Sequence, residues 1–234
     1  MTNFIPFTQA MIDESLVQSR KREEHINHYF ESDVMDGETR NQVGFLGEFA
    51  CCVALGLDWK ANIRRDYLTA DHGDLILNGK KIDVKTNTHD SRFIPPHEKY
   101  PQGHFLVTEK QRSRLGDYDF IVNGAIDRAK MDGWYPVGFI STKELKSLPT
   151  ATHHSLTGNK YSSGEVIELK YSKLKPLECL CMETVENYGV TEGVGGEHED
   201  ILEDAERFIE ANHDEPHEEL REAARIIKEL LILV

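Results

Sequence analysis

The chain has 234 residues, 39% of them hydrophobic, and a formal net charge of −14 at pH 7. This length suits one domain with a small appendage, and the apolar share is sufficient for one buried core. The sequence has no run of eighteen apolar residues, so we expect no membrane-spanning segment. Its first residues also lack the basic and apolar regions of a secretory signal.

The four cysteines form one adjacent pair, Cys51 and Cys52, and one pair a residue apart, Cys179 and Cys181. Both spacings are poor for a disulfide within the pair and for a zinc site. The pattern favours a reducing, cytoplasmic setting.

The acidic charge is concentrated at the C-terminal end. From Glu183 onward there are 16 acidic and 4 basic residues, a net charge of −12, which leaves −2 for residues 1–182. A strongly acidic chain disfavours a nucleic-acid partner. Because the excess lies in the tail, the first part of the chain can still carry a basic surface.

The predicted elements alternate between helices and strands. In the first half we expect a helix over 8–30, a turn at 36–37, a helix over 41–57 and extended segments over 59–67, 75–77 and 80–86. After a proline-containing loop we expect strands over 105–108, 118–126, 134–140 and 166–169. A short helix begins at Ser141 with a capping-box pattern, and residues 150–164 are typical of a loop.

A stretch with four glycines over 189–196 precedes two predicted amphipathic helices, which lie over 197–212 and after Pro216. We therefore expect a main domain over 1–182, with its core at about 41–170. The remaining residues, 183–234, are predicted to form a glycine-containing linker and an acidic helical hairpin. Its short apolar stripes favour packing on the main domain or a homodimer contact.

Asn78-Gly79 is the strongest short-range signal in the chain, because a two-residue hairpin turn needs positive φ at both positions. Counting outward from this turn pairs Leu75 with Ile82 and Asp74 with Asp83. Alternation then predicts a core face made of Leu75, Leu77, Ile82 and Val84. The opposite face holds Asp74, Asp83 and Lys85.

Directly opposed aspartates lie about 5 Å apart at Cβ, and like charges there are unfavourable. A divalent cation neutralises them well, since Mg²⁺ and Mn²⁺ prefer carboxylate, carbonyl and water oxygens. Lys85, two residues along the same face, is placed to orient a water or to hold a phosphate oxygen. The alternative is that Asp74 begins a strand and that Asp83 and Lys85 form an ordinary exposed strand face.

The segment over 41–57 is apolar nearly all round, which predicts a buried helix. Glu48 is its one charged side chain, and a buried carboxylate is costly unless it is paired or metal-bound. Gly44 and Gly47 lower helix propensity, which indicates a close approach to another element. The alternative is that Glu48 reaches solvent or a distant arginine.

These residues together resemble the PD-(D/E)XK nuclease superfamily, which has the restriction-endonuclease-like fold. The match consists of Gly47-Glu48 in a first core helix, Asp74 at the start of a strand, and Asp83-Val84-Lys85-Thr86 in the next strand. Gly73 stands where the family motif has proline. The resemblance covers residues 41–145.

The resemblance implies an α/β fold, with an α-β-β-β-α-β core whose mixed sheet is flanked by helices. It implies one or two Mg²⁺ or Mn²⁺ ions held by Asp74, Asp83 and the Val84 carbonyl, with Glu48 binding directly or through water. Lys85 would assist the attacking water. The reaction implied is hydrolysis of DNA phosphodiester bonds, by endonuclease or exonuclease action, with RNA as the other candidate substrate.

Five basic residues near this region are candidate contacts for backbone phosphates: Arg64, Arg65, Lys110, Arg112 and Arg114. His153-His154 lies in the predicted loop without a carboxylate at ligand spacing, and is interpreted as surface. Two further functions stay open. One is a catalytically silent nucleic-acid-binding module of the same fold, and the other is an interaction protein whose acidic tail mimics DNA.

Overall fold

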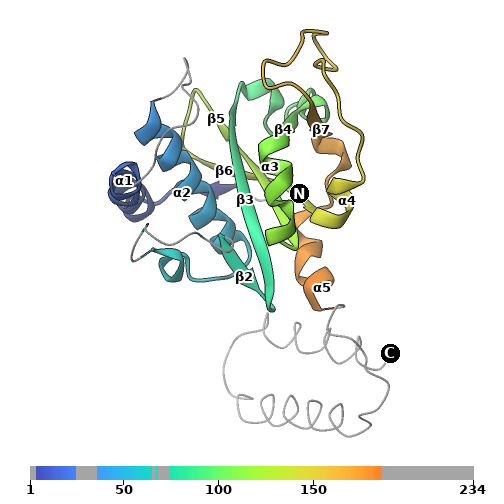
Figure 1. Ribbon diagram of the computed structural model, residues 1–234. Coiled ribbons are helices and arrows are strands. Elements are labelled where there is room, and N and C mark those ends of the chain that lie inside the picture. The colour runs from blue at the N-terminus through green and yellow to red at the C-terminus, as the bar shows by residue number, and fades with distance from the viewer. Residues whose placement is uncertain (1–3, 25–35, 65–66, 68–73, 186–234) are drawn as a thin grey trace, which may run out of the picture. The chain divides into compact units, whose positions relative to one another are not determined.

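The computed structural model describes residues 4–24, 36–64, 67 and 74–185 (Figure 1). These residues form a mixed α/β structure around a five-stranded sheet with the strand order β1-β6-β5-β3-β2. The strands are β1 (Ile5–Pro6), β2 (Leu75–Leu77), β3 (Lys80–His89), β5 (Phe120–Asp127) and β6 (Gly133–Ser141). β3 and β5 pair in parallel, and the other neighbours are antiparallel.

Helices and a second, smaller sheet cover the two faces of this sheet (Figure 1). The helices α1 (Gln9–Glu23) and α2 (Gly37–Ala54) lie on one side. The other side carries α3 (Glu109–Arg114), α4 (Thr142–Lys146) and the antiparallel pair β4 (His104–Thr108) and β7 (Val166–Lys170). A last described helix is α5 (Leu180–Val185). Short 3-10 helices lie at Trp59–Asn62, Ser91–Phe93, Tyr100–Gln102, Leu115–Asp117, Tyr171–Lys173 and Leu177–Cys179.

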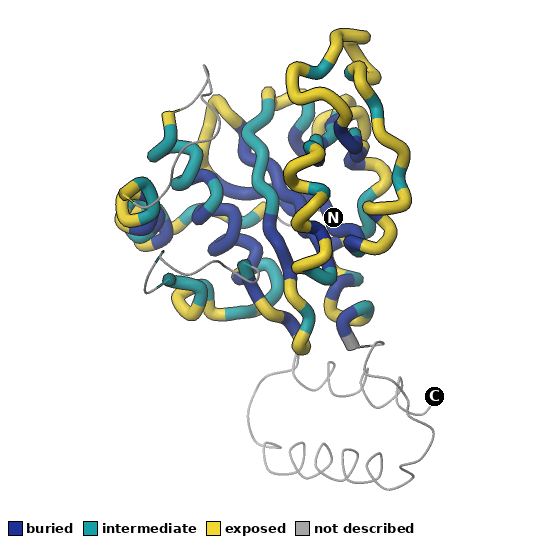
Figure 2. The backbone as a smooth tube through the Cα atoms, in the orientation of Figure 1, coloured by how far each residue is buried: buried dark blue, intermediate teal, exposed yellow. Residues whose placement is uncertain are grey.

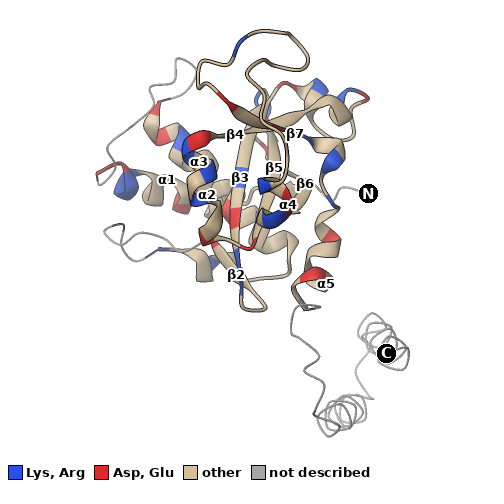
Figure 3. Cartoon of the chain, turned by 45° about the vertical axis from the view of Figure 1, so that its right-hand side comes forward, with Lys and Arg blue, Asp and Glu red and all other residues tan. Residues whose placement is uncertain are grey.

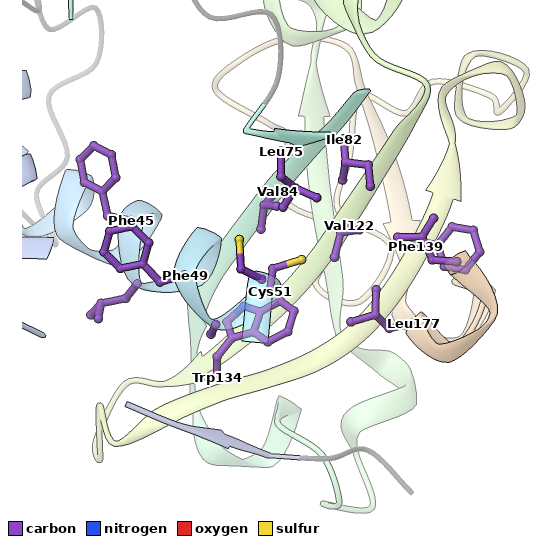
Figure 4. Packing of buried hydrophobic residues seen from close by; sticks show 14 of the residues in the cluster. Phe45, Phe49, Cys51, Leu75, Ile82, Val84, Val122, Trp134, Phe139 and Leu177 are labelled. Carbon is purple, nitrogen blue, oxygen red and sulfur yellow. The ribbon is translucent and has the colours of Figure 1, made fainter. Parts of the chain in front are cut away.

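The core between α2 and the sheet is the larger of two hydrophobic clusters (Figure 4). Cys51 of α2 lies near Val84 and Trp134 of the central strands, and Phe45 and Phe49 belong to the same buried cluster farther along the helix. Burial of the apolar helix is the main term that holds α2 on the sheet. Figure 2 shows the buried residues gathered along the central strands and the inner side of α2.

A second cluster lies on the opposite face, between the sheet and β4, β7 and α4. A bulge in β6 determines which of its side chains join each of the two clusters. Asn123 pairs with Gly138 but Gly124 pairs with Pro136, so that Val137 is the additional residue. The bulge changes the alternation of β6, and Trp134 and Phe139 therefore face the α2 side, while Val137 joins the second cluster.

The predicted hairpin is confirmed in its turn and in its register from Leu75 to Ile82, while the expected pairing of Asp74 with Asp83 is not part of the strand ladder. Asn78 and Gly79 have φ values of 49° and 73°, as the two-residue turn requires. Leu75 pairs with Ile82 and Leu77 with Lys80. All four residues of the predicted core face, Leu75, Leu77, Ile82 and Val84, are buried.

The helix boundaries differ from the prediction because of local capping. Thr8 caps α1 as expected, since its side chain accepts the Met11 N–H, but α1 ends at Glu23. The turn predicted at Asp36-Gly37 is wrong. The Asp36 side chain accepts the Thr39 N–H at 2.7 Å and caps α2, which therefore begins at Gly37, before the predicted start at 41.

Two further elements differ from the prediction. The extended segment predicted from Trp59 begins instead as a 3-10 helix, because the Asp58 side chain accepts the Lys60 N–H at 3.0 Å. The helix α3 was not predicted. Its signal is present in the sequence, since Thr108 and Gln111 form a complete capping box at its start.

The described part of the chain ends within one compact unit, Met1–Asn187. The boundary expected at 182 falls inside α5. The expected linker, acidic helical hairpin and homodimer contact lie outside the described residues. Within the described part, no helix combines the length and the hydropathy needed to cross a bilayer.

At Gly47, α2 packs directly on β3. A Cβ at this position would lie 1.7 Å from Thr86 Oγ1 and 2.7 Å from Thr86 Cβ. The Thr86 hydroxyl is also bonded by the Trp134 indole N–H at 3.2 Å, so it cannot move away freely. The predicted close approach is confirmed for Gly47 and wrong for Gly44, where a Cβ would meet nothing within 4 Å.

We predict opposite effects for two alanine substitutions one helical turn apart. Gly47→Ala should lower the free energy of unfolding by roughly 1–3 kcal/mol, because the methyl group overpacks the contact with Thr86. Gly44→Ala should leave it unchanged or raise it by up to about 1 kcal/mol, because alanine is the better helix former. Urea unfolding of both variants measures the difference, and equal effects would contradict this packing.

Candidate active site

Asp74 lies at the edge of β3, just where β2 begins. Its N–H donates at 2.9 Å to the carbonyl of Ile82, the residue that pairs with Leu75, so the regular ladder ends before Asp74. Its Oδ2 atom accepts the Val84 N–H at 2.6 Å. The carboxyl of Asp74 is thus held against the edge of β3, next to Asp83.

Asp83 and Lys85 form a close ion pair on β3. Lys85 Nζ lies 2.7 Å from Oδ1 and 2.6 Å from Oδ2 of Asp83. Burial raises the pKa of the Asp83 carboxyl, the Lys85 ammonium opposes this, and the Asp74 carboxylate adds to it. Burial lowers the pKa of Lys85, but Asp83 and Asp74 raise it by more, so the ammonium stays charged.

Glu48 is joined to Asp74 through Arg64. One nitrogen of the Arg64 guanidinium, Nη2, lies 3.3 Å from Glu48 Oε2 and 3.1 Å from Asp74 Oδ1. The Asn62 amide also donates to Glu48 Oε2 at 3.3 Å. The side chain of Glu48 is only 5% exposed, and the charge on this buried group is therefore compensated by a specific cation.

These carboxylates come from two faces of the sheet. Ile82 and Val84 belong to the cluster under α2, so by alternation Asp83 and Lys85 point to the opposite face. Glu48 belongs to α2 itself. Asp74, at the strand edge between the two faces, contacts Arg64 on one side and the β3 backbone on the other. The site is therefore centred on the edge of β3.

A cavity of about 110 Å³ opens on the Asp83 side of this edge. Its walls come from β3, β4, α3 and the following turn, and they include Asp83, Lys85, Gln111, Arg114 and Tyr118. Arg114 lies near enough to lower the pKa of both Asp83 and Tyr118, although burial raises both. The ion pair thus lies in the wall of a small, largely apolar cavity beside a basic side chain.

The donor set fits a hard cation such as Mg²⁺. The carboxylates of Asp74 and Asp83 supply oxygen ligands, which Mg²⁺ prefers. The Val84 carbonyl points to the same side as its N–H, which is the side of Asp74. Asn123, on the neighbouring strand, donates to the Lys85 carbonyl at 3.0 Å, while its own Oδ1 atom is buried and has no hydrogen-bond partner.

Glu48, Asp74 and Asp83 do not converge on one point in this structure. Among the described residues, the set whose three ligand atoms lie within 4.8 Å of one another is His104, His154 and Glu168. At the β3 edge, the Arg64 nitrogen occupies the position between Glu48 and Asp74. Direct binding of a metal by Glu48 therefore requires Arg64 to withdraw.

The basic residues predicted to contact phosphate have different surroundings in the structure. Arg64 was expected to contact phosphate, which remains a prediction; in this structure its guanidinium pairs with Glu48 and Asp74. Arg65 lies outside the described residues. Lys110, Arg112 and Arg114 lie on α3, and Arg114 lines the cavity; their contact with nucleic acid remains a prediction.

The sequence prediction missed Asn62, Asn123 and Tyr118, because their contacts depend on tertiary packing. It also interpreted His154 as surface for lack of a nearby carboxylate. That interpretation is corrected, since β7 brings Glu168 to this histidine. The spacing of residues along the chain gives no signal for such a contact.

Comparison with known proteins found no matching family model, no matching curated protein and no matching solved structure. The chemistry of the site is therefore inferred from its own residues and their geometry.

We predict that Arg64 and Mg²⁺ substitute for one another. Arg64→Met should destabilise the metal-free chain by roughly 3 kcal/mol, because two largely buried carboxylates lose their shared cation. Mg²⁺ should raise the melting temperature of this variant by more than that of the wild-type chain, because the ion can replace the guanidinium. Thermal unfolding in EDTA and in MgCl₂ measures both effects.

Arg92→Met is the matched control, because Arg92 pairs with Asp90 on the surface, with both side chains about half exposed. It should melt as the wild type does in both buffers. An equal Mg²⁺ increment in the Arg64 variant and the wild type would show that the ion does not bind at these carboxylates.

Proposed function

We propose that this protein is a Mg²⁺-dependent nuclease that hydrolyses phosphodiester bonds of DNA and has a restriction-endonuclease-like core. The observation that carries the proposal is the hairpin register. It brings Asp74 to the open edge of β3, where its carboxyl accepts the Val84 N–H next to Asp83 and Lys85, and where Arg64 links it to Glu48.

The topology supports this core in part. The β2–β3 hairpin, the crossover through α3 and the return of β5 parallel to β3 follow the β-β-α-β order that the PD-(D/E)XK resemblance implies. One expected strand differs, because Trp59–Asn62 is a 3-10 helix. β6 and β1 extend the sheet beyond β5.

The residues that would hold Mg²⁺ are Asp74, Asp83 and the Val84 carbonyl, with Glu48 binding directly or through water. When bound, the ion lowers the pKa of a coordinated water and stabilises charge on the phosphoryl group. Asp74 keeps its bond to the Val84 N–H through Oδ2, which leaves Oδ1 for the cation once Arg64 withdraws.

Lys85 acts as a hydrogen-bond donor in this proposal. Its side chain is 38% exposed and lies in the wall of the cavity. An ammonium group cannot accept a proton, so its role is to orient the attacking water or to hold a phosphoryl oxygen. Neutralisation of Asp83 by the metal would free Nζ for that contact.

The helix α3 is the element best placed to hold the DNA backbone. It carries Lys110, Arg112 and Arg114 and lies beside β3 (Figure 3), and Arg114 lines the cavity together with Asp83 and Lys85. Phosphate contacts of this kind position a substrate without reading its sequence.

We predict that Asp83→Asn lowers the rate of Mg²⁺-dependent DNA cleavage by at least about 100-fold, since metal stabilisation is worth several kcal/mol and each 1.36 kcal/mol is tenfold in rate. The substitution keeps the side-chain shape, so the fold should survive. Gel assays on linear, circular and single-stranded DNA and on RNA measure the rate and identify the substrate.

Asp90→Asn, an exposed carboxylate in the loop after β3, should cleave as the wild type does. Full activity of the Asp83 variant would overturn the site. Binding of DNA without cleavage by the folded wild-type chain would favour the catalytically silent binding module.

We predict that Arg114→Ala weakens DNA binding in EDTA roughly tenfold, because it removes one charge-assisted contact to phosphate. The slope of log affinity against log salt should fall in magnitude by about 1. Lys130→Ala, between β5 and β6 and outside the residues that line the cavity, is the control. Fluorescence anisotropy with a labelled duplex at several salt concentrations gives both quantities, and an unchanged salt slope would contradict this role of Arg114.

A further inference from the structure

A cluster of two histidines and a glutamate lies on the small β4–β7 sheet. His104 begins β4, and Glu168 is in the middle of β7, where it pairs with Leu106. His104 and Glu168 are therefore diagonal neighbours on one face of this sheet. His154 comes from the loop between α4 and β7, which bridges at Ala151 and His153 hold in place.

The ligand atoms of the cluster already converge. One atom each of His104, His154 and Glu168 lie within 4.8 Å of one another. His104 Nδ1 is 3.9 Å from Glu168 Oε1, and the two imidazole rings meet edge to face with centroids 4.5 Å apart. The side chains of His104 and Glu168 are 15% and 6% exposed, so water has limited access to them.

His104 offers a nitrogen that has no other partner. Its Nδ1 atom is buried and makes no hydrogen bond within the described part of the chain. In a neutral imidazole one nitrogen donates and the other keeps a lone pair. In the tautomer with its hydrogen on Nε2, the ring offers the Nδ1 lone pair to a metal, 3.9 Å from Glu168 Oε1.

Glu168 is oriented by a second layer of contacts. The Ser155 N–H donates to Oε2 at 2.9 Å, and the Ser155 hydroxyl donates to Oε1. Tyr161 lies beside the same carboxylate: burial and Glu168 raise the pKa of Tyr161 to about 12. Hydrogen bonds of this kind to a carboxylate are typical of ligands in metal sites.

We propose that His104, His154 and Glu168 bind one Zn²⁺ ion. Two imidazole nitrogens and one carboxylate are a donor set that zinc uses, with a fourth position left for water. Mg²⁺ avoids nitrogen ligands, so the two sites of the chain are distinguished by donor chemistry. The zinc site lies outside the residues of the proposed nuclease site and stands without it.

Zinc binding has one structural consequence at His154. The Nδ1 atom of His154 now accepts the N–H groups of Leu156 at 3.0 Å and Thr157 at 3.3 Å. Coordination through Nδ1 takes this lone pair, and coordination through Nε2 puts a hydrogen on Nδ1. In both cases His154 Nδ1 stops accepting the N–H groups of Leu156 and Thr157. Because Leu156 and Thr157 are exposed, water can bind these N–H groups instead.

The ion would link the loop over 150–164 to β4 and β7, because its ligands come from all three segments. This matters for the neighbouring cavity, because Phe105, Leu106 and Val107 of β4 form part of its wall. A bound zinc ion stabilises the state that binds it by mass action.

The test is zinc titration of the full chain after removal of metals with EDTA and buffer exchange. Isothermal titration with ZnCl₂ should give one site whose affinity falls at least about 100-fold in His154→Ala. Glu168→Gln should weaken binding as well. His153→Ala is the matched control, because this adjacent histidine is exposed on the same loop and should bind zinc as the wild type does.

Two spectroscopic readouts identify the ligands independently of activity. Co²⁺ in place of Zn²⁺ should give visible absorption in the wild type and lose it in His154→Ala. The amide NMR signals of Leu156 and Thr157 should shift on zinc binding. Equal zinc affinity in the wild type, His154→Ala and Glu168→Gln would overturn the proposal, as would no zinc binding by the wild type. Mg²⁺-dependent cleavage in zinc-free buffer tests the nuclease proposal separately.

Discussion

The turn at Asn78-Gly79 is the constraint on which the candidate site depends. Its two positive φ angles close a two-residue hairpin, and Asp74, directly before the first strand of that hairpin, accepts the Val84 N–H beside Asp83. A shift by one residue would turn Ile82 and Val84 toward the cavity and bury Asp83 under α2. The apolar face under α2 and the acidic edge are therefore selected together by the same turn.

Charge compensation at this edge follows from burial. Glu48, Asp74 and Asp83 are all largely withdrawn from water, and a carboxylate in that position needs a partner. In this structure Arg64 serves the first two and Lys85 the third. Arg64 and Lys85 therefore occupy the positions at which the proposed reaction needs a metal ion and a substrate phosphate. Replacement of the Arg64 guanidinium by Mg²⁺ is the central physical step of the proposal.

Local signals predicted much of the fold. The hairpin, the buried helix α2 and its approach at Gly47 follow from turn chemistry, periodicity and helix propensity, which act over a few residues. Two wrong predictions are explained by side-chain capping. Asp36 and Asp58 each accept a backbone N–H and start a helix where a turn or a strand was expected. The role of Arg64 and the meeting of His104 with Glu168 depend on tertiary packing, for which spacing along the chain has no signal.

The parallel pairing of β3 with β5 has a consequence for the order of folding. It joins residues such as Asp83 and Ile121, far apart in sequence, whereas the β2–β3 hairpin closes through two residues. Hairpins form in about 1–10 μs, and pairings between distant segments are slower. We therefore expect Asp74 and Asp83 to come together early, in a hairpin still open to water, and the cavity walls from β4 and α3 to form later. The repulsion between the Asp74 and Asp83 carboxylates thus arises while water can still screen it.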